Sequence, residues 1–381
     1  MGILVISFDA VGDYVFESMA KDSKNYPNIS KFKEESYYRG GVKTVFVSNT
    51  YPVHTTVSTG KLPKDHGVIS NLLPPAKSGE RPWAQMAKLI KARTIWEAAR
   101  EKKLSTAAML WPVTCGAKID YHMPELHVQK GQNFLFHSLR HGSVFFQLSA
   151  LLKYGGMLAK AFGSKMQGIG QPELDNFTTA VTCDMLKNKK PDLALVHLFA
   201  YDTVFHFTES GGEEVIRAKK AMDTNLGRLL ESWAEDTVIV FSDHAQLEVK
   251  ETINLNAIYG DAVFEQTGGS AFLRRAIEGL EKQLWFERYL TTEEMQQSGY
   301  ADKPVLGIAA KAGYCFSESN KYKGNHGYPV DYDNYRIFYG VRGKNFMPGQ
   351  EQKWLKNRVT DITAIIAREL NLDMEILEEY S

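Results

Sequence analysis

Short apolar runs recur along this chain, and segments with helical spacing lie between them. The runs cover residues 3–8, 42–47, 105–110, 192–199, 237–241 and 336–339. Uninterrupted apolar strands that alternate with helices are typical of a mostly parallel sheet covered by helices on both faces. The sequence therefore predicts an α/β fold, and its 381 residues are compatible with one catalytic domain spanning 1–381.

Helical spacing supports this alternation, and two long segments interrupt it. Residues 95–103 and 212–234 each place apolar side chains on one helical face. The interruptions are 114–171 and 249–319, which we interpret as insertions that cap a cleft. Within the first, the aromatic stretch 134–162 either packs inside that cap or lies as a helix on a membrane surface.

Composition narrows the class of protein. Lys plus Arg is 45 and Asp plus Glu is 45, so overall charge gives no reason to expect binding to a nucleic-acid polymer. Cys115, Cys183 and Cys315 form no CxxC pattern, and we expect three isolated core residues. No run reaches the roughly 18 apolar residues of a transmembrane segment. Because the first strand begins at residue 3, we expect no signal peptide and a cytoplasmic location.

Residues of the types that bind divalent metals lie in four short clusters. The clusters are Asp9, Asp202 with His206, Asp243 with His244, and His326. Each cluster alone is compatible with an ordinary turn, a helix N-cap or an i,i+4 pair. The aspartates, however, follow predicted strands, and ligands of open α/β sheets bind outside the carboxyl ends of strands. Carboxylate oxygen with imidazole nitrogen suits zinc or a similar ion.

Thr50 lies just after the second predicted strand, in Val-Ser-Asn-Thr-Tyr-Pro, and Pro52 stands where a helix would begin. A hydroxyl at a helix N-terminus meets free N–H groups and the positive end of the helix dipole. Both favour an alkoxide and an incoming phosphate. The sequence therefore predicts Thr50 as a metal-activated nucleophile, with a simple N-cap threonine as the alternative.

Several blocks carry a resemblance to a known family. The nucleophile region continues as Ser-Thr-Gly-Lys-Leu-Pro-Lys-Asp-His-Gly-Val-Ile-Ser-Asn, and the later blocks include Thr-Ile-Trp at 94–96, Leu-Trp-Pro at 110–112, Ser-Asp-His at 242–244 and Asn-His-Gly-Tyr at 325–328. Over nearly its whole length the chain resembles the type I phosphodiesterase/nucleotide pyrophosphatase family of the alkaline phosphatase superfamily. The resemblance implies an alkaline-phosphatase-like three-layer sandwich with capping insertions.

The resemblance also implies which residues bind each metal ion and which residue is the nucleophile. One metal would be held by Asp202, His206 and His326, and a second by Asp9, Asp243, His244 and the Thr50 oxygen. The expected cofactors are two divalent ions, zinc first, with manganese or iron as alternatives. Thr50 would attack phosphorus in line, and water would resolve the resulting phospho-threonine.

Substrate residues follow from the same resemblance. Asn71 matches a side chain that donates to a phosphoryl oxygen, with a turn asparagine as the structural alternative. Tyr51 and Tyr121 match an aromatic pair that clamps a nucleobase. The expected partner is a small phosphate ester, nucleotide-type substrates included. Three departures from the family pattern concern substrate choice: Ala245-Gln246 in place of Gly-Met, Pro329 in place of an acidic residue, and His197 in place of Tyr.

Two other functions remain open at this point. The same site could act as a phosphonoacetate hydrolase or a phosphomonoesterase, and the first needs basic groups for a substrate carboxylate. The candidate basic groups are Lys61, Lys64, Lys321 and Lys323. A metal-binding protein that has kept the fold without catalysis is the alternative of a different class.

Overall fold

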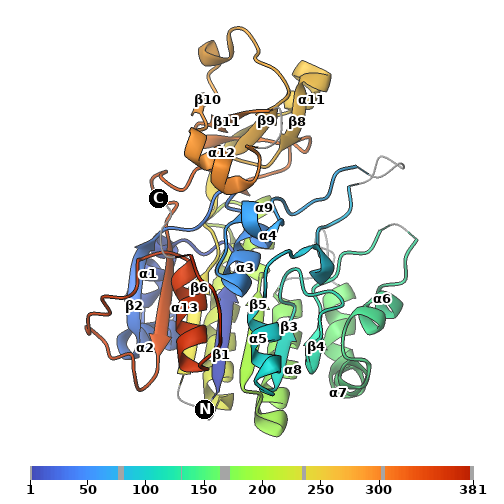
Figure 1. Ribbon diagram of the computed structural model, residues 1–381, viewed down its shortest axis with the longest axis vertical. Coiled ribbons are helices and arrows are strands. Elements are labelled where there is room, and N and C mark those ends of the chain that lie inside the picture. The colour runs from blue at the N-terminus through green and yellow to red at the C-terminus, as the bar shows by residue number, and fades with distance from the viewer. Residues whose placement is uncertain are drawn as a thin grey trace.

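The computed structural model describes residues 2–75, 81–129, 131–163, 172–233, 237–301 and 305–377. Within these ranges the largest sheet has seven strands, in the order β2-β14-β6-β1-β5-β3-β4 (Figure 1). Their bounds are β1 Ile3–Phe8, β2 Tyr37–Val42, β3 Thr106–Met109, β4 Tyr121–Met123, β5 Leu193–Leu198, β6 Thr237–Ser242 and β14 Ile337–Arg342.

The sheet is mostly parallel, as predicted. β6, β1, β5, β3 and β4 run parallel to one another, whereas β14 runs antiparallel to both β2 and β6. Because the parallel strands share one direction, their carboxyl ends meet at one edge of the sheet.

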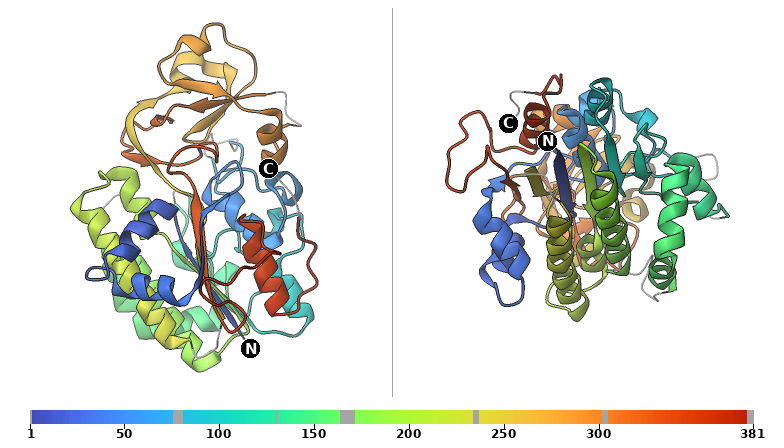
Figure 2. Two further views of the ribbon diagram at one scale, coloured as in Figure 1. Left: turned by 90° about the vertical axis from the view of Figure 1, so that its left-hand side faces the viewer. Right: turned by 90° about the horizontal axis from the view of Figure 1, so that it is seen from below.

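Helices cover both faces of this sheet, which confirms the three-layer architecture (Figure 2). In β1 the side chains of Leu4, Ile6 and Phe8 belong to the core on one face, and those of Ile3 and Val5 to the core on the other. This period-two division is what a strand buried on both faces requires. The first face carries α1 Asp13–Lys21, α2 Pro27–Glu35, α8 Glu173–Lys189, α9 Ala200–Phe207 and α10 Glu213–Ser232. The second carries α3 Thr50–Thr59, α5 Ile95–Glu101 and α13 Thr360–Glu369.

The two predicted helices are present with slightly different ends. α5 begins after Thr94, whose side chain accepts from the N–H of Glu97 while the Glu97 carboxylate accepts from the N–H of Thr94. This capping box explains why the helix starts there. α10 covers most of 212–234, and residue 234 lies outside the described ranges.

The second predicted strand, 42–47, is wrong. The observed strand is β2, which ends at Val42 where the predicted one begins. Val45, Phe46 and Val47 are buried, but after Val42 the β-pairing that the described residues show for this segment is an isolated bridge between Lys43 and Arg358. An apolar run indicates that a segment is buried, but it does not show that the segment is a strand. Here the apolar side chains are buried by packing, and the backbone does not form a ladder of strand hydrogen bonds.

The chain between β6 and β14 builds a smaller region beyond the carboxyl ends of the main strands (Figure 1, top). One of its sheets contains β8 Val263–Gln266, β9 Ser270–Leu273, β10 Phe286–Tyr289 and β11 Leu306–Ala310. The other contains β7 Leu247–Ile253, β12 Gly313–Phe316 and β13 Gly324–Asn325. The region also contains the short helices α11 Leu255–Tyr259 and α12 Thr292–Ser298. The described residues of the predicted insertion 249–319 lie within this region.

The other predicted insertion, 114–171, supplies the edge strand β4 and two helices, α6 Phe134–His141 and α7 Val144–Gly163, while residues 164–171 lie outside the described ranges. α7 packs against α8 and β4. Its outer face exposes Phe145 and Leu152, each 90% accessible. Of the described helices, none is long and apolar enough to cross a bilayer. That either insertion closes over a substrate stays a prediction.

Candidate active site

The metal-type residues gather at the carboxyl edge of the parallel strands. Asp9 follows β1 and Asp243 follows β6, and these strands pair with Phe8 opposite Ser242. Register therefore brings the two carboxylates together. The N–H of Asp9 also donates to the carbonyl of Leu198 at the end of β5, 3.0 Å away, which ties Asp9 to the strand that leads into α9.

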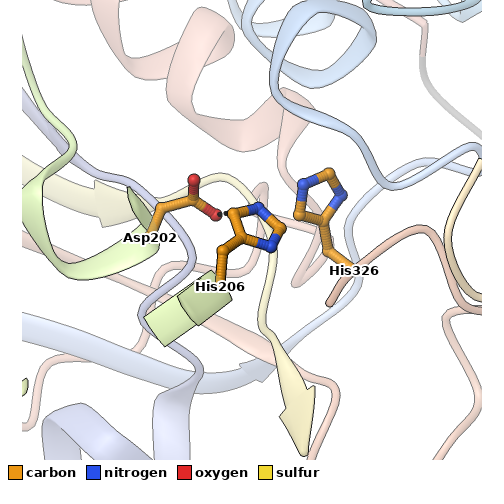
Figure 3. A group of neighbouring side chains, drawn as sticks. All are labelled: Asp202, His206 and His326. Atoms are coloured by element: carbon orange, nitrogen blue, oxygen red, sulfur yellow. Dashed lines mark ion pairs between the residues drawn. The ribbon is translucent and has the colours of Figure 1, made fainter. Parts of the chain in front are cut away.

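Asp202, His206 and His326 form the first group (Figure 3). Asp202 and His206 lie one turn apart on α9, as predicted, with Asp202 Oδ1 3.4 Å from His206 Nε2. Burial opposes charge on both groups, but their attraction lowers the pKa of Asp202 and raises the pKa of His206. His326 follows β13, where Gly327 adopts a positive φ and a Cβ would lie 1.9 Å from the Thr267 carbonyl. Only glycine fits that turn.

His244 is the centre of the second group. Its Nε2 lies 3.3 Å from Asp9 Oδ1, 3.3 Å from Asp243 Oδ2 and 3.2 Å from Thr50 Oγ1. Ligand atoms of Asp9, Asp202 and His244 also lie within 4.8 Å of one another. Asp202 therefore borders both groups, which are less separated than the sequence led us to expect.

Hydrogen bonds orient the three metal-type histidines in the same way. Nδ1 of His206 lies 2.9 Å from the Gly324 carbonyl, and Nδ1 of His244 lies 3.2 Å from the Ala245 carbonyl. Nδ1 of His326 lies 2.8 Å from Asn49 Oδ1. Because each partner is an acceptor, each Nδ1 carries the proton and each Nε2 presents a lone pair to the cluster. Such outer contacts fix the tautomer that a metal requires.

Buried atoms without partners mark the space between these side chains. In the described chain, Asp9 Oδ1, Asp243 Oδ2 and His197 Nε2 are buried and make no hydrogen bond. Burial, and then the nearby charge of Asp243, raises the pKa of the Asp9 carboxyl well above its ordinary range. Carboxylates so placed are costly unless cations offset them. The residues present therefore fit a pair of divalent cations.

Thr50 is the first residue of α3, as predicted, and it is nearly buried. The neighbouring amide of Tyr51 donates to Asn71 Oδ1 over 2.8 Å, so that N–H is not free for a phosphate. Asn71 lies in the loop after the short helix α4, Pro63–His66, and its carbonyl accepts from Ala84 N–H at 2.8 Å. With its side-chain oxygen used, Asn71 has its amide NH₂ left to donate beside Thr50.

The predicted aromatic clamp is not formed in this structure. Tyr51 is fully buried, with its ring 5.3 Å from that of Trp83. Tyr121 is the first residue of β4. It pairs with Ala107 of β3, which pairs with Ala194 of β5, which in turn pairs with Leu4 of β1, so Tyr121 lies at the same height in the sheet as Leu4. A strand rises about 3.3 Å per residue, so the level of Leu4 and Tyr121 lies roughly 15 Å before Asp9 along the strand direction. Its ring contacts Phe146 of α7 instead.

Three residues without a predicted role adjoin the cluster. His197 Nε2 lies 3.2 Å from Asp9 Oδ2, and Gln246 donates to the Asp202 carboxylate. His54 Nδ1 donates to the Thr50 carbonyl over 2.8 Å, one turn along α3. His197 and Gln246 were visible in the sequence as departures from the family pattern. His54 could have been found from its i+4 spacing to Thr50.

Comparison with known proteins places this geometry in a family. Residues 3–368 match the family described as type I phosphodiesterase/nucleotide pyrophosphatase. The chain belongs to this family. Its members are hydrolytic enzymes, which agrees with an assembly of carboxylates, imidazoles and a helix-terminal hydroxyl.

Curated relatives are distant in sequence and longer than this chain. The venom phosphodiesterase CdcPDE of Crotalus durissus collilineatus is 21% identical over 386 residues, covering 91% of this chain and 41% of the venom protein. Human ectonucleotide pyrophosphatase/phosphodiesterase family member 1 is 24% identical over 248 residues, covering 62% of this chain and 23% of the human protein. The chain thus spans less than half the length of these relatives.

Solved structures support the fold. Human ectonucleotide pyrophosphatase/phosphodiesterase 5 superposes with a TM-score of 0.68 at 16% identity, covering 98% of this chain and 96% of the other. The inactive murine protein in complex with AMP gives a TM-score of 0.64 at 17% identity, with the same coverage. At this level of identity the likeness establishes the architecture alone.

Proposed function

We propose that this chain is a two-metal hydrolase that cleaves phosphodiester or pyrophosphate bonds through a phospho-threonine intermediate. One observation carries the proposal: the Thr50 hydroxyl lies 3.2 Å from His244 Nε2, beside a cluster of three carboxylates and three histidines in which Asp9, Asp243 and His244 are buried. A lone N-cap threonine would not need such surroundings.

We assign the ligands to the two ions as the family resemblance implies. Asp202, His206 and His326 would hold one ion, and Asp9, Asp243, His244 and Thr50 Oγ1 the other, with zinc proposed first. When bound, the two ions would supply Lewis-acid chemistry, favouring deprotonation of the hydroxyl and of water and offsetting charge on phosphoryl oxygens.

The proposed reaction has two displacements at phosphorus. In the first, the Thr50 hydroxyl releases its proton to solvent, the Thr50 Oγ1–P bond forms, and the bond from phosphorus to the leaving-group oxygen breaks, so that the leaving group departs with the bonding electron pair. In the second, a water oxygen bonds to phosphorus, the Oγ1–P bond breaks, and Thr50 regains a proton. The Asn71 amide donates to a phosphoryl oxygen whose negative charge grows during each displacement.

The candidate substrates are phosphate esters related to nucleotides. The relatives' names and the murine complex with AMP make nucleotide phosphodiesters and pyrophosphates candidate substrates. The phosphonoacetate alternative receives less support, because Lys61 lies beyond the far end of α3 and pairs with Glu375 at 3.0 Å. Lys64, Lys321 and Lys323 are exposed.

The test is hydrolysis by the zinc-loaded protein of a matched pair, bis(nitrophenyl) phosphate and nitrophenyl phosphate, together with phosphonoacetate. The proposal expects the diester to be the best substrate. Preference for the monoester or for phosphonoacetate would move the assignment to those branches. A loaded protein that turns over none of them would support a binding protein instead.

A further inference from the structure

Asn71, the proposed donor to a phosphoryl oxygen, lies on the loop that follows α4 and not on a strand of the main sheet. This Asn71 loop comprises residues 67–75 and 81–86 of the described chain. It lies beside Thr50 and the strand-end cluster, which consists of Asp9, Asp202, His206, Asp243, His244 and His326. A donor stabilises a transition state only from the right position, and a shift of about 1 Å can lower a rate about 10²-fold. The contacts that hold this loop therefore bear on the chemistry at Thr50.

Glu265 of β8 reaches the Asn71 loop from the smaller region. Its Oε1 accepts from Ser70 Oγ at 2.7 Å and from Arg81 Nη2 at 2.6 Å, and its Oε2 accepts from the Tyr300 hydroxyl. Burial, and then the charge of Glu265, raises the pKa of Tyr300 well above its ordinary range, so the Tyr300 hydroxyl keeps its proton and donates. The Glu265 side chain is only 7% exposed. A nearly buried carboxylate with three donors makes stronger contacts than an exposed ion pair.

The two donors from the loop lie on either side of Asn71 along the chain. Ser70 directly precedes Asn71, and Arg81 follows it. Arg81 also donates through Nε to the Leu73 carbonyl over 3.1 Å, which ties the later part of the loop to the part that carries Asn71. One oxygen of Glu265 thus holds the loop both before and after Asn71.

The other oxygen of Glu265 is held within the smaller region. Tyr300 is fully buried, and its ring stacks on that of Phe272 with 3.6 Å between centroids and 6° between planes. Phe272 belongs to β9, which pairs with β8, the strand of Glu265. The carboxylate therefore has a fixed support, and the Asn71 loop takes its position from the smaller region as well as from α3.

We propose that Glu265 is a positioning residue for the reaction at Thr50, acting through Ser70 and Arg81 on Asn71. The inference rests on the proposed function and adds a residue to that same site. Glu265 takes no part in bond making or breaking. Its contacts keep the Asn71 NH₂ directed at a phosphoryl oxygen while negative charge grows there.

The experiment compares Glu265→Leu with Glu294→Leu, using the zinc-loaded protein and a methyl nitrophenyl phosphodiester. Glu294 is the matched control in the same region, because its side chain is 14% exposed and also accepts three hydrogen bonds, from Arg288 and from the Thr291 N–H. None of these partners belongs to the Asn71 loop. Glu265→Leu should lower kcat by about 10- to 10²-fold with KM little changed, because the donor acts in the transition state. Glu294→Leu should change neither, and unchanged kcat in Glu265→Leu would overturn the proposal.

Glu265→Gln is the conservative variant. Its amide oxygen can still accept from Ser70 and Arg81, while its NH₂ can donate to the Tyr300 hydroxyl oxygen. We expect kcat within about fivefold of the unchanged protein. A loss as large as that of Glu265→Leu would contradict positioning through these hydrogen bonds.

Ser70→Ala decides the question if Glu265→Leu does not fold. It removes a single hydroxyl and so a single link between Glu265 and the loop. Loss of one hydrogen bond should lower kcat at least about threefold, with KM little changed. Unchanged kcat would overturn the proposal.

Combination with Asn71→Ala tests whether Glu265 acts through Asn71. Two residues that act through one contact are not additive, so Glu265→Leu should lower kcat no further once Asn71 is alanine. A general loss of folded protein would lower kcat by the same factor in both backgrounds. That result would overturn the proposal.

Absence of turnover by the unchanged protein would count against the proposed function instead. Hydrogen exchange of the N–H groups of Tyr51 and Ala84, which both donate to Asn71, then decides the positioning on its own. Exchange, measured by mass spectrometry of peptides that contain them, should be faster in Glu265→Leu than in Glu294→Leu. Equal exchange in the two variants would overturn the role of Glu265.

Discussion

The strand-end cluster and the α6–α7 region differ in how they are held. In the cluster, Asp243 and His244 are wholly buried polar residues, and the Asp243 carboxylate accepts N–H groups of Ala10 and His244 at 3.1 and 2.8 Å. Sheet register and hydrogen bonds fix that geometry. On α7, by contrast, large apolar residues such as Phe145 are exposed, and helix packing rather than sheet pairing holds the helix.

This contrast separates two tasks. A metal centre needs ligand atoms placed within fractions of an ångström, and paired strand ends provide that. Substrate choice tolerates variation, and helices at the edge of a sheet can change without disturbing the metal ligands. We therefore expect changes in the cluster to affect the chemical step for all substrates, and changes in the α6–α7 region to depend on the substrate.

Thr50→Ala should have the largest effect. Removing the attacking oxygen should lower kcat by roughly 10⁴-fold or more for every diester, because a covalent path loses its nucleophile. Metal content, measured by plasma emission spectroscopy, should stay near that of the unchanged protein. Near-native turnover in this variant would remove Thr50 from the mechanism.

Asp243→Asn should come next and should affect metal and activity together. The exchange removes one negative charge from the second group while keeping the size of the side chain. We expect metal content and kcat to fall in parallel, with at least one ion per chain lost on dialysis. Full occupancy with ordinary kinetics would mean that Asp243 is a structural residue of the β6 end.

Asn71→Ala should have an intermediate effect. Loss of one donor to a developing oxyanion typically lowers kcat by about 10²–10³-fold. Asn71→Ala also removes the oxygen that accepts a hydrogen bond from the Tyr51 N–H. Asn71→Asp is therefore the control, because it keeps this acceptor and lacks the NH₂ donor. Similar losses in both variants support the donor role, whereas restored activity in Asn71→Asp would show that positioning of Tyr51 matters more.

Tyr121→Ala should have the smallest effect on catalysis and tests the other side of the contrast. Tyr121 packs on Phe146 of α7, so its loss should lower the free energy of unfolding by about 1–3 kcal/mol. KM for a thymidine nitrophenyl diester and for the methyl nitrophenyl diester should change by the same factor. A selective rise for the nucleoside ester would restore Tyr121 to a base-stacking role.

Sequence patterns predicted the parts of the fold that burial determines. β1, β5 and β6 are covered on both faces and appear as continuous apolar runs at the right places. β2 was missed because its sequence, Tyr-Tyr-Arg-Gly-Gly-Val, lies at the sheet edge and is largely half-exposed. β4 has three residues, too few for a periodic signal.

The candidate site likewise contains residues that the sequence predicted and residues that it did not. The metal-type residues were found because each stands at a strand end or at i,i+4 spacing on a helix. The partners that orient them, such as Asn49 for His326, come from distant parts of the chain and carry no local signal. The base-clamp role of Tyr121 stays a prediction, because residue type was visible in the sequence and strand register, which places Tyr121 at the start of β4, was not.

The most direct test of the central claim is the stereochemical course of hydrolysis at phosphorus. A chiral phosphorothioate diester hydrolysed in ¹⁸O-labelled water reports how many in-line displacements occur. Two displacements through Thr50 predict overall retention of configuration. Overall inversion would mean that water attacks the substrate directly, which would contradict a phospho-threonine intermediate.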